Sequence, residues 1–96
     1  MVIVMDDELI TKIVQRLKLN NGIIEAETGF DDMFKELINQ ATDDLALVGI
    51  DYAESNKKGY VNAVLAFVNA IFNIDDTQTH DRLMSMYAQL LIDLQS

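Results

Sequence analysis

The segment YVNAVLAFVNAIFNI, which runs from Tyr60 to Ile74, is the only long stretch of this sequence without a charged residue. On a helix at about 100° per residue, its aromatic and branched side chains cover more than half of the circumference, with Leu65 at their edge. These side chains are Tyr60, Val61, Val64, Phe67, Val68, Ile71 and Phe72. The pattern predicts that residues 60–74 form the buried central helix of an all-α bundle of about four helices.

The rest of this helix surface is a narrow strip of amide and small side chains. We call it the Asn/Ala strip, and it consists of Asn62, Ala63, Ala66, Asn69, Ala70 and Asn73. Because small side chains let another helix come close, the strip is a candidate contact face for another subunit; the alternative is that it faces solvent. A membrane span needs roughly 20 apolar residues, whereas this segment is shorter and is interrupted by Asn, so we do not expect a membrane protein.

Length and composition limit the organisation of the chain. Its 96 residues suit a single domain, residues 1–96, with one modest core, and its flexible ends are expected at 1–5 and 95–96. The absence of Cys excludes disulfides, thiol catalysis and thiolate metal sites. Acidic residues follow directly after Met5, which is unlike a signal peptide. We therefore expect an intracellular protein.

The balance of charge is strongly acidic. The chain has 16 acidic and 7 basic residues, which gives a net charge of −9. Nucleic-acid binding depends on Lys and Arg contacts with phosphate, so this charge argues against it. An acidic surface can instead mimic DNA, although it more often keeps a protein in solution.

A first helix is expected from Asp6 or Asp7, which can cap it, to about Lys18. Its core stripe repeats at i, i+3, i+4 and i+7 and consists of Ile10, Ile13, Val14 and Leu17. Glu8, Lys12 and Arg16 are spaced four apart on the outer face and can pair along it. That face is either an ordinary solvated surface or, through Lys12 and Arg16, a docking face for an acidic partner.

The middle of the chain is expected to hold a loop, a second helix and a surface connection. Asn20, Asn21 and Gly22 end the first helix, and the adjacent Ile23 and Ile24 are either a contact point or tucked under the loop. Residues 31–48 form the second helix, with Phe34, Leu37, Ile38, Ala41, Leu45 and Val48 on its core face. Gly49 ends this helix, and residues 50–58 read as a surface connection.

A last helix is expected after the polar segment 75–81, capped by Asp75, Asp76, Thr77 or Asp81. Its core stripe is predicted to consist of Leu83, Tyr87, Leu90, Leu91 and Leu94. Ile92 falls on the opposite side of this helix, where it is a further candidate contact residue.

No motif for catalysis, phosphate binding or a cofactor is present in the sequence. His80 is the only His, so it cannot build a transition-metal site with a second one, and we expect it on the surface in a turn. The acidic cluster of Asp75, Asp76 and Asp81 lacks the Gly and the closing Glu of a calcium loop. We therefore expect no enzyme, cofactor or metal.

Residues 31–96 resemble the small helical head-tail connector proteins of tailed bacteriophages, also called adaptor or head-completion proteins. The resemblance rests on the leucine-rich turn Leu45 to Ile50, on the central helix Val61 to Phe72, and on the Arg-Leu, Tyr and Leu pattern of Arg82 to Leu90. The chain differs where members often begin the central helix with Asp-Pro, because it has Lys57-Lys58-Gly59 there. It also has Leu91 where members tend to have Lys.

The resemblance implies a structural protein without enzymatic activity in the virion, present in the host cytoplasm before assembly. It implies a ring of about twelve copies that binds the portal protein and a downstream connector or tail protein, with DNA passing through without specific binding. Because copies at −9 repel one another, we expect a monomer or low oligomer at low salt and a ring on the portal. The alternative is an acidic regulatory or inhibitory binding module, including a DNA mimic.

Overall fold

The computed structural model describes residues 5–95, and within them the chain is all-α, with no β-strand. Its elements are α1 (Asp7–Asn20), α2 (Asp31–Leu47), the short 3-10 helix η1 (Glu54–Asn56), α3 (Lys57–Phe72) and α4 (Thr77–Gln95). The predicted all-α fold is confirmed. Each predicted helix is present, although α3 begins at Lys57 and ends at Phe72 instead of spanning residues 60–74.

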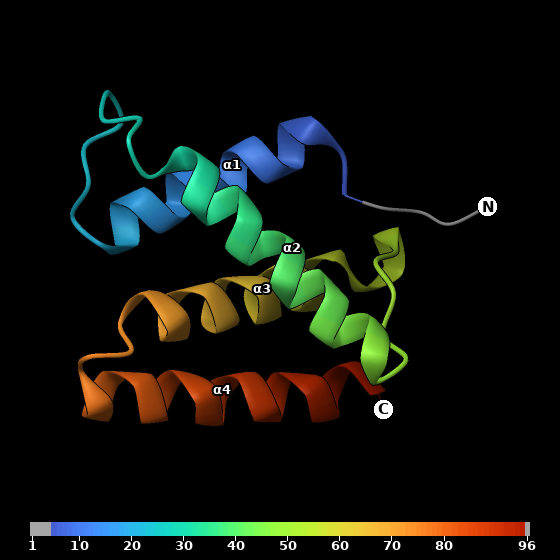
Figure 1. Cartoon of the computed structure of the whole chain (residues 1–96). Helices are drawn as coiled ribbons and strands as arrows, with labels where there is room; N and C mark the ends of the chain where they lie inside the picture. Colours follow the sequence, from blue (N-terminus) through green and yellow to red (C-terminus); the bar gives the residue numbers. More distant parts are fainter. Residues whose placement is uncertain (1–4, 96) are drawn as a thin grey trace.

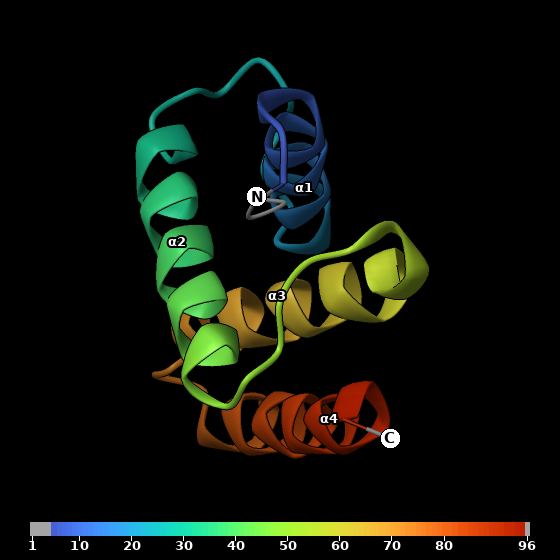
Figure 2. The ribbon, with the colours of Figure 1, turned by 90° about the vertical axis from the view of Figure 1, so that its right-hand side faces the viewer.

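Helix α3 lies at the centre of the bundle. Figures 1 and 2 show α4 running antiparallel along one side of α3, while α1 and α2 pack on other sides of it. The core therefore forms around α3, where the charge-free segment predicted it. Its fully buried side chains from the other helices include Leu17 of α1 and Phe34, Ile38 and Leu45 of α2.

The ends of the helices follow the expected capping chemistry. The Asp6 carboxylate accepts a hydrogen bond of 2.8 Å from the backbone N–H of Leu9 at the start of α1. Asp76 caps α4, because its carboxylate accepts hydrogen bonds from the backbone N–H and the hydroxyl of Thr79. Gly22 and Gly49 follow α1 and α2 with φ of 70° and 83°, a conformation that glycine adopts without strain.

The segment between α2 and α3 is more than a surface connection. Ile50 and Tyr52 are buried, and the rings of Tyr52 and Tyr60 pack edge to face with centroids 5.5 Å apart. Asn56 holds the turn, since its side chain accepts from the N–H of Ala53 and donates to the carbonyl of Asp51. The prediction that residues 50–58 lie wholly on the surface was wrong for Ile50 and Tyr52.

Helix α4 is less deeply buried than its sequence pattern predicted. Within it only Tyr87 is fully buried, and its ring packs edge to face on Phe67 of α3 with centroids 5.4 Å apart. The other members of the predicted stripe, Leu83, Leu90, Leu91 and Leu94, are half-buried. An outer helix with one neighbour along most of its length leaves part of its apolar face open, and α4 packs mainly on α3.

The two chain ends differ in how far the structure describes them. Met5 is buried in the core, and Nε2 of Gln95 donates a hydrogen bond of 3.0 Å to the carbonyl of Val48. The remaining residues of the ends predicted to be flexible, 1–4 and 96, lie outside the described residues. Within residues 5–95, no helix combines the length and apolar character that crossing a bilayer requires.

Candidate functional site

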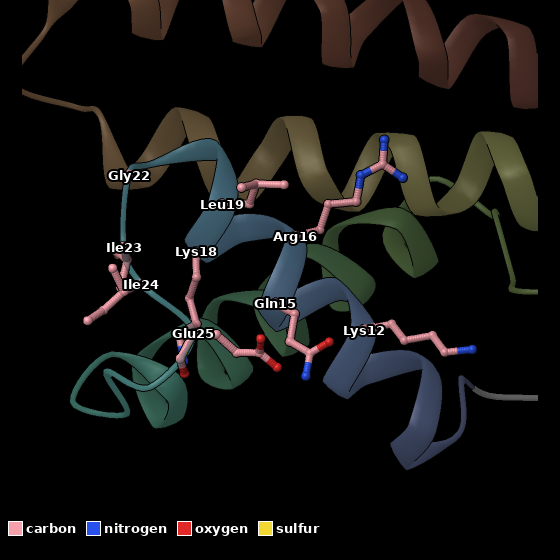
Figure 3. A pocket seen from close by; sticks show the side chains of 9 residues that line it. All are labelled: Lys12, Gln15, Arg16, Lys18, Leu19, Gly22, Ile23, Ile24 and Glu25. Carbon is pink, nitrogen blue, oxygen red and sulfur yellow. The ribbon is translucent and has the colours of Figure 1, made fainter.

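The outward side of α1 and the loop after it form a hollow that we call the α1–loop surface. It is lined by Lys12, Gln15, Arg16, Lys18, Leu19, Gly22, Ile23, Ile24 and Glu25 and has a volume of about 690 Å³ (Figure 3). Lys12, Gln15, Arg16 and Leu19 are spaced 3, 4 and 7 residues apart, so they share one face of the helix. Opposite the core, the chain therefore presents a continuous stripe of long side chains.

Exposed apolar side chains stand out on this surface. Leu19 is 79% exposed and Ile24 is 72% exposed. Leu19 was not among the contact residues predicted from the sequence. Its position, about 180° around the helix from Ile10 of the core stripe, nevertheless indicated that it is exposed. Two large apolar side chains beside a shallow hollow are a typical contact surface for another protein.

Within residues 5–95, the basic residues of the stripe form few ion pairs. Lys12 lies 3.5 Å from Glu8, and both side chains are largely exposed, so this ion pair contributes little stability. No carboxylate of residues 5–95 forms an ion pair with Arg16. Both cations are thus available to an acidic partner on a chain whose net charge is −9.

Lys18 fixes the loop that completes the hollow. It is only 3% exposed, and its Nζ lies 3.0 Å from Oδ1 of Asp31 and donates a hydrogen bond of 2.9 Å to the carbonyl of Glu25. From the sequence, Lys18 was expected only as the approximate end of the first helix. Its position four residues after buried Val14 was the available signal, since i and i+4 share a face.

Ile23 and Ile24 were expected either to form a contact point or to be tucked under the loop, and the two residues differ. Ile23 is half-buried, packs against the core and donates its backbone N–H to the carbonyl of Lys18. Ile24 projects into solvent beside the hollow. The anchored residue therefore positions the exposed one.

The alanines of the Asn/Ala strip are covered by the chain itself, which corrects their expected role. Ala63, Ala66 and Ala70 are buried, so they do not form an open subunit contact and do not face solvent. At one end of the strip a Cβ on Gly59 would lie 3.0 Å from Cδ2 of Leu94, and at the other end Nδ1 of His80 lies 2.7 Å from the carbonyl of Ala70. These contacts place α4 along the strip, where small side chains permit close packing.

The amide side chains of the strip are also engaged within the subunit. Nδ2 of Asn21 donates to Oδ1 of Asn69 at 2.9 Å, and Nδ2 of Asn73 donates to Oδ1 of Asn21 at 3.2 Å. This network joins the end of α1 to α3. Asn69 and Asn73 therefore link α3 to the end of α1. A projection of a single helix could not reveal this link.

Part of the strip still reaches a groove between α3 and α4. This α3–α4 groove has a volume of about 550 Å³, and Asn62, Ala66 and Asn69 line it together with Leu83, Met86 and Leu90. Asn62 is half-exposed there.

On the outer side of α4, Ile92 is 59% exposed, as its position predicted. Val48, expected in the core, is exposed beside Leu47 at the end of α2.

His80 differs from its prediction as a surface turn residue. It lies in the first turn of α4 and is half-buried. A carbonyl oxygen only accepts, so Nδ1 donates to Ala70 and the proton of a neutral ring is on that nitrogen. Across residues 5–95, no cluster of His, Asp or Glu side chains could hold a metal ion.

The candidate site is therefore the α1–loop surface, made of the α1 stripe and the loop that Lys18 anchors. Comparison of the chain with protein-family models, with curated proteins and with solved structures found no match.

Proposed function

We propose that this chain is a structural adaptor that docks as a ring on the portal vertex of a tailed bacteriophage and joins the capsid to the tail. The observation that carries the proposal is the α1–loop surface, where exposed Leu19 and Ile24 flank Lys12 and Arg16. Apolar anchors beside basic residues, on a chain of net charge −9, suit contact with an acidic protein. The resemblance of residues 31–96 to connector proteins identifies the proposed partners as the portal protein and a downstream connector or tail protein.

The charge of the chain sets when the ring forms. Copies that each carry −9 repel one another within about a Debye length, so the isolated protein stays a monomer or low oligomer at low salt. A portal surface supplies contacts that offset this repulsion, and the ring forms there. An acidic channel also suits the passage of DNA, because it repels phosphate and does not retain the genome.

Co-sedimentation with portal complexes from the same genome tests the role of the α1–loop surface. The double variant Lys12→Glu with Arg16→Glu reverses the exposed charges of the stripe, and we expect it to lose most of its binding. The matched control is Lys57→Glu with Lys58→Glu, which makes the same charge change at exposed residues at the start of α3. Equal binding by both variants would contradict the assignment of this surface.

A further inference from the structure

A smaller hollow lies where the start of α1, the second half of α2 and residues 50–52 meet the first turn of α3. Its volume is about 280 Å³, and we call it the tyrosine pocket. Ile10, Ile38 and Ile50 form an apolar wall, while Asp43, Asp51 and the paired rings of Tyr52 and Tyr60 supply its polar groups. Apolar and acidic groups thus converge on one small space.

The hydroxyl of Tyr60 is an unused polar group in this pocket. Tyr60 is only 4% exposed, and no side chain or carbonyl of residues 5–95 makes a hydrogen bond with its hydroxyl, whereas the neighbouring Tyr52 hydroxyl donates to Glu54 at 3.4 Å. Tyr60 lines the pocket, and its hydroxyl oxygen is not among the fully buried unpaired atoms of the described residues, so solvent reaches it. The hydroxyl is therefore free to form a hydrogen bond with a ligand that enters the pocket.

The electrostatic surroundings of the tyrosine pocket are negative. Burial and then the charges of Asp51 and Asp43 raise the pKa of Tyr60, and burial and then Glu54 raise the pKa of Tyr52. The charges that act on the two phenols come from carboxylates, with Asp6 adding to the effect on Tyr52. The carboxylates of Asp43 and Asp51 have no ion-pair partner within residues 5–95. The pocket consequently favours a positive ligand.

We propose that the tyrosine pocket binds a basic side chain, Arg or Lys, of a partner protein. The aliphatic stem of such a side chain would lie along the isoleucine wall, as these stems do on apolar surfaces. Its cationic head would meet the carboxylates of Asp43 and Asp51 and the tyrosine rings, which attract cations. The head would also donate a hydrogen bond to the hydroxyl of Tyr60.

The size of the pocket and its chemistry select this ligand over others. Pockets for whole small molecules usually measure about 300–1,000 Å³, and the tyrosine pocket at about 280 Å³ suits one long side chain. Nucleic acid is excluded by repulsion from Asp43 and Asp51. The proposal does not depend on the adaptor role, because it concerns a different face of the molecule.

Nuclear magnetic resonance titration of the full chain tests the pocket. The probes are the peptides acetyl-Gly-Arg-Gly-amide and acetyl-Gly-Lys-Gly-amide, with acetyl-Gly-Gln-Gly-amide as the neutral control, at about millimolar concentrations. We expect the Arg or the Lys peptide to shift the amide signals of Ala46, Asp51 and Tyr60 and the Gln peptide to leave them unchanged. Equal shifts with the Gln peptide would overturn the proposal.

Charge-matched variants separate pocket binding from general attraction to an acidic protein. Asp43→Asn with Asp51→Asn should raise the dissociation constant about tenfold, which corresponds to about 1.4 kcal/mol. Asp75→Asn with Asp81→Asn removes the same charge from exposed residues outside the pocket and should change it less than about twofold. Circular dichroism checks that all variants remain folded, and equal weakening by both pairs would overturn the proposal.

Discussion

The hydroxyl of Tyr87 donates a hydrogen bond of 2.6 Å to Oδ2 of Asp44, and this bond ties α4 to α2 past the central helix. Tyr87 is the buried residue of α4, while Asp44 is half-exposed on α2. Burial, followed by the hydrogen bond to Asp44, raises the pKa of Tyr87. Because α4 packs mainly on α3, this bond gives α4 a direct polar link to α2.

Replacing Tyr87 by Phe should destabilise the protein, because a hydrogen bond to a charged group contributes about 1.5–3 kcal/mol. We expect a loss of that size in the free energy of unfolding measured with urea. Asp44→Asn keeps an acceptor oxygen and should cost less. A Tyr87→Phe variant as stable as the parent would show that the bond contributes nothing to folding.

The raised pKa of Tyr87 also predicts how alkali affects folding. A folded-state pKa above the usual 10.0 means that the folded protein holds the phenol proton more tightly than the unfolded chain does. The stability contributed by Tyr87 is therefore complete below pH 10 and is lost as the pH rises above it. Thermal unfolding at alkaline pH should show a steeper decline for the parent than for Tyr87→Phe.

Tyr60→Phe provides the contrasting case. The Tyr60 hydroxyl has no hydrogen-bond partner in residues 5–95, so its removal takes away no bond while the packing of the ring on Tyr52 remains. We expect the free energy of unfolding to stay within about 0.5 kcal/mol of the parent value or to rise. A loss as large as that of Tyr87→Phe would reveal a bond that the structure does not show.

Lys18 should be important for the loop that carries Ile24. Lys18→Met keeps the aliphatic packing but removes the contacts with Asp31 and the carbonyl of Glu25, which should cost about 1–3 kcal/mol. Hydrogen exchange at residues 23–27 should also become faster. The double variant Lys18→Met with Asp31→Asn should recover part of the loss, because it no longer leaves a carboxylate unpaired.

The cap of α4 predicts a pH effect at the acidic end. Hydrogen bonds from the backbone N–H and the side chain of Thr79 lower the pKa of Asp76 below its usual 3.8. A lowered folded-state pKa contributes stability above pH 3.8, and this contribution is lost as the pH falls through the lowered value. Asn does not titrate, so the melting-temperature advantage of the parent over Asp76→Asn should shrink between about pH 6 and about pH 2. A constant difference would contradict the assigned cap.

The sequence predicted the fold well because hydrophobic periodicity, capping residues and Gly positions are local signals. It predicted the contact surfaces less well, and the Asn/Ala strip shows why. A helical projection identifies the side with small residues, but it does not tell which helix packs on that side, and here His80 of α4 in the same chain contacts the carbonyl of Ala70. The buried position of Lys18 depends likewise on Asp31, a residue from another helix.

The structure leaves three of the predicted contact residues exposed, namely Lys12, Arg16 and Ile24. The structure adds Leu19 between them, since its side chain is opposite the core. In the proposed role, these side chains contact a second molecule. The proposed adaptor role is therefore tested on assemblies.

Electron microscopy of portal complexes mixed with this protein tests the proposed adaptor role most directly. The complexes should come from the same genome, and the Lys12→Glu, Arg16→Glu variant should be imaged beside the parent. We predict a ring of added density beneath the portal with the parent chain, and a weak or absent ring with the variant. Portal complexes without added density at saturating concentrations of the parent chain would contradict the adaptor role.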